Sequence, residues 1–166
     1  MNELLLFAAS VALSLLTWSV VCFRHVWPSM KSATLSDAAR PILLLHCFRF
    51  IGLVFVVPGV VSPTLQAGFA IPAAYGDLLA VLLAWAALLA LRGPFERLAL
   101  WAFSLWGTAD IFFAFYQGVI GVHIAPSALG AAFFLPTICV PLLLVTHAML
   151  FALLLSKAPK LVIASA

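Results

Sequence analysis

The feature that most constrains the fold of this chain is a succession of five apolar runs, separated by charged residues or by clusters of proline and glycine. A helix needs about 20 apolar residues to cross the hydrocarbon core of a bilayer, and each run is about that long. The runs are Leu4–Phe23, Ile42–Val61, Pro72–Leu91, Leu98–Val122 and Phe133–Ser156. We therefore predict an all-α, polytopic transmembrane bundle of five membrane-spanning helices, built as a single domain over residues 1–166.

The composition agrees with this prediction and limits the kinds of partner that we expect. Hydrophobic residues make up 66% of the chain and charged residues only 8%, whereas about a quarter of the residues in soluble domains are charged. The first run has no basic segment before it and no cleavage site with a polar chain after it, so we interpret it as a retained helix. The eight Lys and Arg residues are too few and too scattered for a nucleic-acid interface, and the lipid bilayer is the partner that we expect.

The connections between the runs alternate in charge. Lys and Arg occur in the connection 24–40, in the turn 92–97 and after residue 156, but not before the first run, nor in 62–71 or 123–132. The positive-inside rule then predicts an N-terminus outside and a C-terminus in the cytoplasm, and we expect the cytoplasmic (inner) membrane of a bacterium. A four-span arrangement would place basic loops on both sides, so the alternation independently favours five spans.

Local signals indicate where the helices begin and bend. Thr34 and Asp37 have the spacing of a capping box, which predicts that the second helix starts there. Pro72 is expected in the first turn of the third helix, where its missing N–H costs nothing. Pro58 and Pro141 lie inside or near the ends of runs, where we expect them to bend the helices.

One face of the third run carries only small residues at steps of three and four. These are Ala73, Gly76, Ala80, Ala84 and Ala87. Such a stripe lets a second helix approach closely. We expect it to pack inside the bundle, with a contact between copies in a homo-oligomer as the alternative.

Ionisable residues inside the runs are the strongest indication of a functional site, because each costs at least about 2.5–3.5 kcal/mol near the bilayer centre. They are His46, Arg49, Asp110 and His147. At about 1.5 Å per residue, Arg49 and His147 lie at nearly the same depth and Asp110 about one turn farther out. We therefore predict an ion pair between Arg49 and Asp110, which would remove two unpaired charges from the hydrocarbon.

The fourth run places Trp106, Asp110, Phe113 and Gln117 on one face, as an aromatic and polar wall. Asp77, which opens the third run, is expected near the outer surface. The candidate binding residues are therefore His46, Arg49, Trp106, Asp110, Gln117 and His147. We expect them to surround a cavity or a hydrogen-bonded core, offset toward the cytoplasmic half.

Three functions fit these residues. In the first, the protein binds or transports a small anionic or protonatable solute, with Arg49 as the charge partner and His147 or Asp110 as the proton-responsive group. In the second, His46 and His147 ligate a b-type haem, or bind a quinone, in a membrane redox subunit. In the third, the polar residues only hold the helices of a structural subunit in a larger membrane complex. We find no G-x-S-x-G, no H-E-x-x-H and no paired acidic motif, so an enzymatic activity is not predicted.

Overall fold

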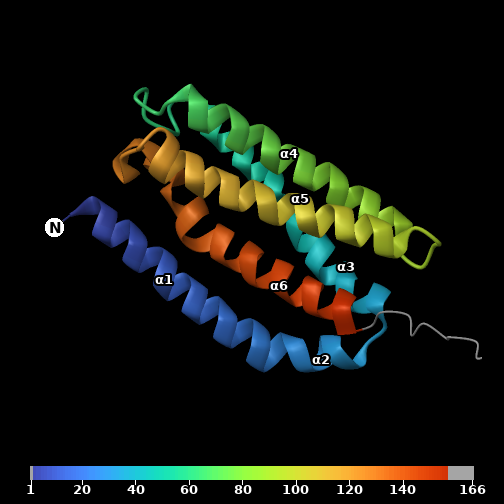
Figure 1. The fold of residues 1–166 in the computed structure, drawn as a ribbon. Helices are drawn as coiled ribbons and strands as arrows, with labels where there is room; N and C mark the ends of the chain where they lie inside the picture. The colour runs from blue at the N-terminus through green and yellow to red at the C-terminus, as the bar shows by residue number, and fades with distance from the viewer. Residues whose placement is uncertain (1, 157–166) are drawn as a thin grey trace, which may run out of the picture.

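The computed structural model describes residues 2–156, and over this range every regular element is a helix (Figure 1). The α-helices are α1 (Glu3–Val21), α2 (Trp27–Ser32), α3 (Leu35–His46), α4 (Ala67–Ala90), α5 (Glu96–Tyr116) and α6 (Val140–Ser156). Short π-helical turns are η1 (Cys22–Val26), η3 (Gln117–Gly121) and η5 (Leu135–Cys139). Two segments are 3₁₀-helical, η2 (Cys47–Val56) and η4 (Pro126–Phe133).

Consecutive elements join into five helices that are long and apolar enough to cross a membrane, which confirms the predicted number. These are Glu3–Ser32, Leu35–Val56, Ala67–Ala90, Glu96–Gly121 and Leu135–Ser156. The chain runs back and forth between two ends of an elongated bundle, so the N-terminal end of α1 and the C-terminal end of α6 lie at opposite ends (Figure 1).

Four boundaries of the predicted runs differ from the boundaries of the helices. The first helix continues from Phe23 to Ser32, so the polar connection 24–40 shrinks to two residues and Arg24 lies on a helix. The second helix begins at Leu35 and ends at Val56, and the third begins at Ala67. The hydropathy of a segment reports where the chain leaves the hydrocarbon, whereas Arg and Lys are good helix formers that extend a helix into water.

The predicted cap of the second helix is present. Thr34 is the N-cap of α3, and its hydroxyl oxygen accepts a hydrogen bond from the Asp37 amide at 3.2 Å. The Asp37 carboxylate does not cap an amide as expected. It accepts hydrogen bonds from the Thr34 hydroxyl at 2.8 Å and from Arg92, which follows α4, at 2.8 Å. The cap therefore also ties the start of α3 to the end of α4.

Pro58 and Pro141 lie inside or near the ends of the spans as predicted, whereas Pro72 lies differently. Pro58 follows η2 and lies outside the helices, and Pro141 is in the first turn of α6, after the π-helical turn η5. Pro72 lies inside α4 rather than in its first turn, because this helix begins five residues earlier. A proline has no N–H for the carbonyl four residues before it, here that of Gly68. The side-chain amide of Gln117 donates to that carbonyl at 3.4 Å.

Packing along the bundle is built around α4. The predicted stripe of small residues on this helix is buried, and α4 makes its most extensive contacts with η2 and α5. The stripe is therefore used inside the chain, as expected. By contrast, α1 buries none of its side chains and lies along one side of the bundle against α6 and η5 (Figure 1).

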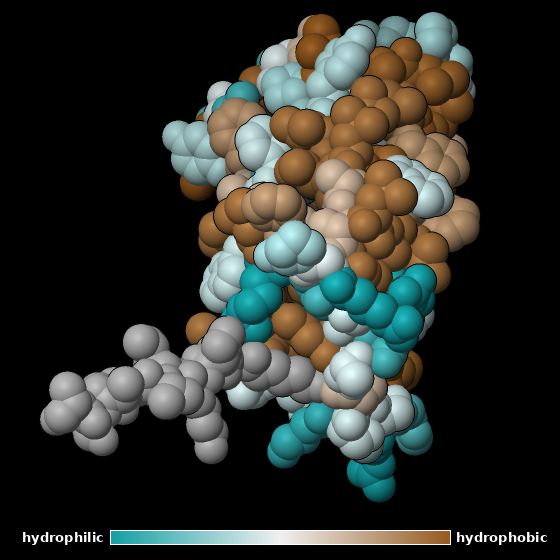
Figure 2. All heavy atoms as spheres, turned by 90° about the vertical axis from the view of Figure 1, so that its right-hand side faces the viewer, coloured by the Kyte–Doolittle hydropathy of each residue, from teal (hydrophilic) through white to brown (hydrophobic). Residues whose placement is uncertain are grey.

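The two ends of the bundle differ in charge. Of the six Lys and Arg residues in the described range, all except Arg49 lie at or near one end, which we call the basic end. Figure 2 views this end and shows hydrophilic side chains gathered over its lower part, with hydrophobic side chains over most of the rest. The opposite end consists of the start of α1, the connection 57–66 and the segment 122–134, and we call it the cavity end for reasons given below.

Candidate functional site

The site begins with a row of residues on η2. A 3₁₀-helix has three residues per turn, so residues three apart lie directly above one another. Arg49, Gly52 and Phe55 form such a row, and all three are buried. The 3₁₀-helix therefore directs the Arg49 guanidinium, the bare backbone of Gly52 and the Phe55 ring toward the interior of the bundle.

Arg49 donates to three oxygens on two neighbouring helices. Its Nε donates to Asp77 Oδ1 of α4 at 2.6 Å, and its Nη2 donates to Asp110 Oδ2 of α5 at 2.7 Å. Its Nη1 donates to the backbone carbonyl of Gly107 at 3.2 Å. The Arg49 side chain is only 1% exposed, against 18% for Asp77 and 8% for Asp110. The predicted Arg49–Asp110 ion pair is therefore present, as part of a cluster that ties η2, α4 and α5 together.

Asp77 is the partner that the sequence reading missed. It was placed near the outer surface because the third helix was expected to begin at Pro72. Since α4 begins at Ala67, Asp77 lies roughly 15 Å along the helix from its start, deep enough to meet Arg49. A third helix that begins at Ala67, five residues before Pro72, predicts Asp77 in the interior.

Three glycines make room for the polar groups, each on the span that precedes its polar residue. A Cβ on Gly52 of η2 would overlap the Asp77 carboxylate of α4, and a Cβ on Gly76 of α4 would overlap the Asp110 carboxylate of α5. A Cβ on Gly107 of α5 would lie 2.5 Å from His147 Nε2 of α6. We call this arrangement the glycine ladder. In this ladder, polar side chains of one helix lie directly against the glycine backbone of the neighbouring helix, which sets the distance between the helices.

A cavity of about 330 Å³ extends from the ionic cluster toward the cavity end. The ionic cluster of Arg49, Asp77 and Asp110 lines it in the middle of the bundle, and Asn2, Glu3 and His123 line it at the cavity end. Most of the remaining wall is apolar and includes four phenylalanines, Phe7, Phe55, Phe69 and Phe115. The site is therefore an apolar chamber with charged groups at both of its limits.

The cavity extends toward the cavity end, whereas the sequence predicts a cavity or a hydrogen-bonded core offset toward the cytoplasmic half. The depths of the polar residues suggested a cavity offset toward the basic loops, that is, toward the basic end. There the interior is instead filled by a close-packed core that includes Leu43, Leu100, Phe103 and Leu150. In the sequence, polar residues indicate only the floor of the chamber. The apolar residues of its walls are indistinguishable from those of a close-packed core.

His46 and His147 are buried beside this cluster but do not line the cavity. Their rings are in contact, with centroids 4.3 Å apart, and Phe103 packs against both at 5.0 Å. His46 Nε2 is 2.9 Å from the Thr146 hydroxyl. The two axial ligands of a haem lie on opposite faces of the macrocycle, which is impossible for rings that touch each other. The pair therefore does not fit the haem-ligating arrangement considered from the sequence.

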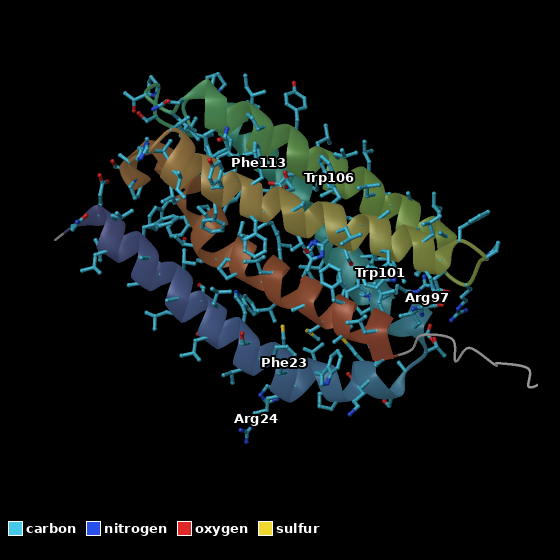
Figure 3. The ribbon with its side chains drawn as sticks, viewed as in Figure 1. Phe23, Arg24, Arg97, Trp101, Trp106 and Phe113 are labelled. Atoms are coloured by element: carbon cyan, nitrogen blue, oxygen red, sulfur yellow. The ribbon has the colours of Figure 1, made fainter. Side chains whose placement is uncertain are left out.

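The other predicted binding residues, Trp106 of α5 and Gln117 of η3, both donate hydrogen bonds to backbone carbonyls of α4. The indole nitrogen of Trp106 donates to the Gly76 carbonyl at 3.3 Å, and Figure 3 shows this side chain beside α4. Gln117 donates to the Gly68 carbonyl, as described above. Neither residue lines the cavity. Of the six candidates, only Arg49 and Asp110 face the chamber, and Asp77 joins them.

Comparison with known proteins adds a family but no activity. The model of a domain of unknown function (DUF8737) matches residues 6–155, which is most of the chain. No curated protein and no solved structure matches the chain.

Proposed function

Since this chain belongs to the DUF8737 family, a domain of unknown function, we propose a function from its site: it binds a small protonatable or cationic solute inside the membrane, as a step in moving that solute across. The observation that carries this proposal is one guanidinium shared by two carboxylates at the floor of an apolar chamber. Ionisable residues inside a membrane protein commonly mark the path of an ion or a substrate.

The charges of the cluster favour a cation over an anion. With all three side chains ionised, Arg49, Asp77 and Asp110 carry one negative charge in excess. In apolar surroundings such an excess is costly, and a proton or a bound cation removes it. An anionic solute would meet this excess of negative charge, and three of the five N–H groups of Arg49 already donate to other oxygens. Of the two solutes considered from the sequence, the protonatable one is therefore the better supported.

We place the basic end in the cytoplasm, and hence the cavity end on the outer side of a bacterial inner membrane. The support is the positive-inside rule, since the connections at the cavity end contain no Lys or Arg. A reporter that is active only in the cytoplasm should be active when fused to the C-terminus and silent at the N-terminus. Activity of the N-terminal fusion would reverse the proposed side of entry.

A structural role is the second candidate, because the same cluster links three spans. The two roles differ in their response to cations. The test measures the melting temperature of the purified protein in lipid nanodiscs with sodium, ammonium, methylamine and benzylamine, for the wild type and Asp110→Asn. Binding to the native state raises the melting temperature by mass action, so at least one cation should stabilise the wild type and not the variant.

Asp37→Asn is the matched control, because it makes the same chemical change in an exposed ion pair at the basic end. It should keep the full response to the cation. If no cation in the series stabilises the wild type, the binding function is wrong and the cluster is structural. An equal response of Asp110→Asn would show that the cation binds elsewhere.

A further inference from the structure

The geometry of the chamber points to the class of ligand, and we infer that it is an amphipathic amine: an ammonium group joined to an apolar body about the size of one aromatic ring. This inference rests on the proposed function and specifies the solute for the same site. Three features of the chamber support it, namely its size, its walls and the distribution of its charges.

The size excludes a bare ion as a complementary ligand. Small-molecule sites in proteins have volumes of roughly 300–1,000 Å³, and this chamber, at about 330 Å³, is at the lower limit of that range. An alkali ion or a proton held by Asp77 and Asp110 would leave nearly all of this space unfilled. A molecule with one ring and a short polar arm is of a size that the chamber can enclose.

The walls select for an apolar body and against a polar one. Phe7 of α1, Phe55 of η2, Phe69 of α4 and Phe115 of α5 line the chamber from four different elements. Phe55 and Phe69 pack edge to face, with ring centroids 5.3 Å apart. Such walls favour apolar surface, whereas the hydroxyls of a sugar-like solute would lose their hydrogen bonds to water without replacement. The negative faces of the rings also attract a cation.

The charges select the sign of the polar arm and its position. The Asp, Glu, Lys and Arg side chains that line the chamber are three acids, Glu3, Asp77 and Asp110, and one base, Arg49. Glu3 lies at the cavity end, where its carboxylate accepts a hydrogen bond from the Ser127 amide at 3.1 Å. A cleft with an excess of one sign of charge concentrates ions of the opposite sign. An ammonium group is therefore attracted at the cavity end by Glu3 and neutralised at the floor by Asp110 or Asp77.

The experiment uses four probes that separate charge from apolar body: benzylamine, benzyl alcohol, benzoate and methylamine. Dissociation constants are measured from the melting temperature of the full-length protein in nanodiscs at neutral pH, where both amines are cations. We expect benzylamine to bind at least about tenfold more tightly than methylamine, because it adds the burial of a ring. Benzyl alcohol and benzoate should give no saturable stabilisation.

A wall variant tests whether the ring lies in this chamber. Phe69→Leu should weaken the binding of benzylamine and leave that of methylamine nearly unchanged, each measured against the variant's own baseline. Phe151→Leu is the matched control, because Phe151 packs against Trp101 and does not line the cavity. An unchanged benzylamine affinity in Phe69→Leu would overturn the assignment of the ring to the chamber.

The outcomes separate this inference from the proposed function. Equal affinities for methylamine and benzylamine would overturn the amphipathic class while the cation site stands. Stabilisation by benzyl alcohol as strong as by benzylamine would overturn both, because the charge would then be irrelevant. A response to benzoate alone would also overturn both, in favour of an anion site at Arg49.

Discussion

The two halves of this bundle have similar apolar sequences but opposite interiors. In the half toward the basic end, side chains such as Leu43, Phe103 and Leu150 are 0% exposed and fill the space between the helices. In the other half, a smaller core cluster that includes Phe55 and Phe69 borders a chamber. The backbones differ too, since the cavity half contains the 3₁₀-helical segments η2 and η4, whereas most residues of the filled core lie on α3, α4, α5 and α6. Apolar composition therefore predicts burial but not close packing.

The ion pairs of the two halves differ in the same way. Arg92 and Asp37 meet at 2.8 Å at the basic end, with side chains that are 67% and 45% exposed. Arg49 is 1% exposed and has two acidic partners. When one partner of an exposed ion pair is removed, water solvates the remaining charge, so little stability is lost. A buried charge that loses its partner is not solvated, so the loss of stability is large. Each half can thus be tested by removing one side chain.

The largest effect is expected from Arg49→Met. It leaves two carboxylates buried without a cation, and we expect a loss of about 3–5 kcal/mol in the free energy of unfolding. The triple variant Arg49→Met, Asp77→Asn, Asp110→Asn should recover much of this loss, because no uncompensated charge remains. Equilibrium unfolding in mixed micelles measures both. Equal losses in the single and triple variants would show that charge compensation is not what the cluster provides.

The next effect compares packing in the two halves. Leu150→Ala, in the half that is filled, should cost about 2–5 kcal/mol, because it removes apolar contacts and leaves a new void. Ile111→Ala, on the wall of the chamber, should cost less, because the new space adds to an existing cavity. The same unfolding assay compares the two. A larger loss for Ile111→Ala would contradict the distinction between a filled and a hollow half.

A smaller effect is expected on the glycine ladder. Gly76→Ala places a Cβ against the Asp110 carboxylate, and overpacking of this kind costs about 1–3 kcal/mol. The matched control is Gly68→Ala on the same helix, where the added Cβ would meet only Val122 Cγ1, at an ordinary 3.5 Å. The control should be neutral or slightly stabilising, because alanine favours a helix. If the two variants have similar stabilities, the Asp110 carboxylate can move away from the added Cβ without a loss in the free energy of unfolding.

The smallest effect is expected at the basic end. Arg92→Gln removes the partner of Asp37 from an exposed pair, and such pairs contribute about 0–1 kcal/mol. Its unfolding free energy should differ from that of the wild type by no more than this, and the difference should shrink further in high salt. A loss approaching that of Arg49→Met would remove the contrast between the two ion pairs.

The number of spans and one ion pair could be predicted from the sequence. The number of spans follows from the number of apolar runs, because the thickness of the hydrocarbon core fixes the length of a span. The second follows from counting depths along Ile42–Val61 and Leu98–Val122, which places Asp110 about one turn from Arg49, within reach of a long arginine side chain. Both predictions need only approximate depths, which the length of an apolar run provides.

What could not be predicted depends on irregular geometry. The third helix begins before its proline, which moved Asp77 from the surface to the cluster. The change from α3 to the 3₁₀ segment η2 aligns Arg49 with Phe55, and an apolar sequence carries no mark of that change. The chamber is lined by phenylalanine and alanine that would serve equally in a filled core. Its position follows from how the backbones meet, which is a tertiary property.

The glycine ladder has a consequence for how the chain is synthesised. Each glycine lies on the span before its polar residue, in the order Gly52 to Asp77, Gly76 to Asp110 and Gly107 to His147. Spans leave the ribosome in this order, so Asp77, Asp110 and His147 each enter the bilayer after the glycine that makes room for them. Arg49 and His46 instead precede their partners. The two members of each step should also change together among relatives, since a larger residue at the glycine position requires a smaller one at its counterpart.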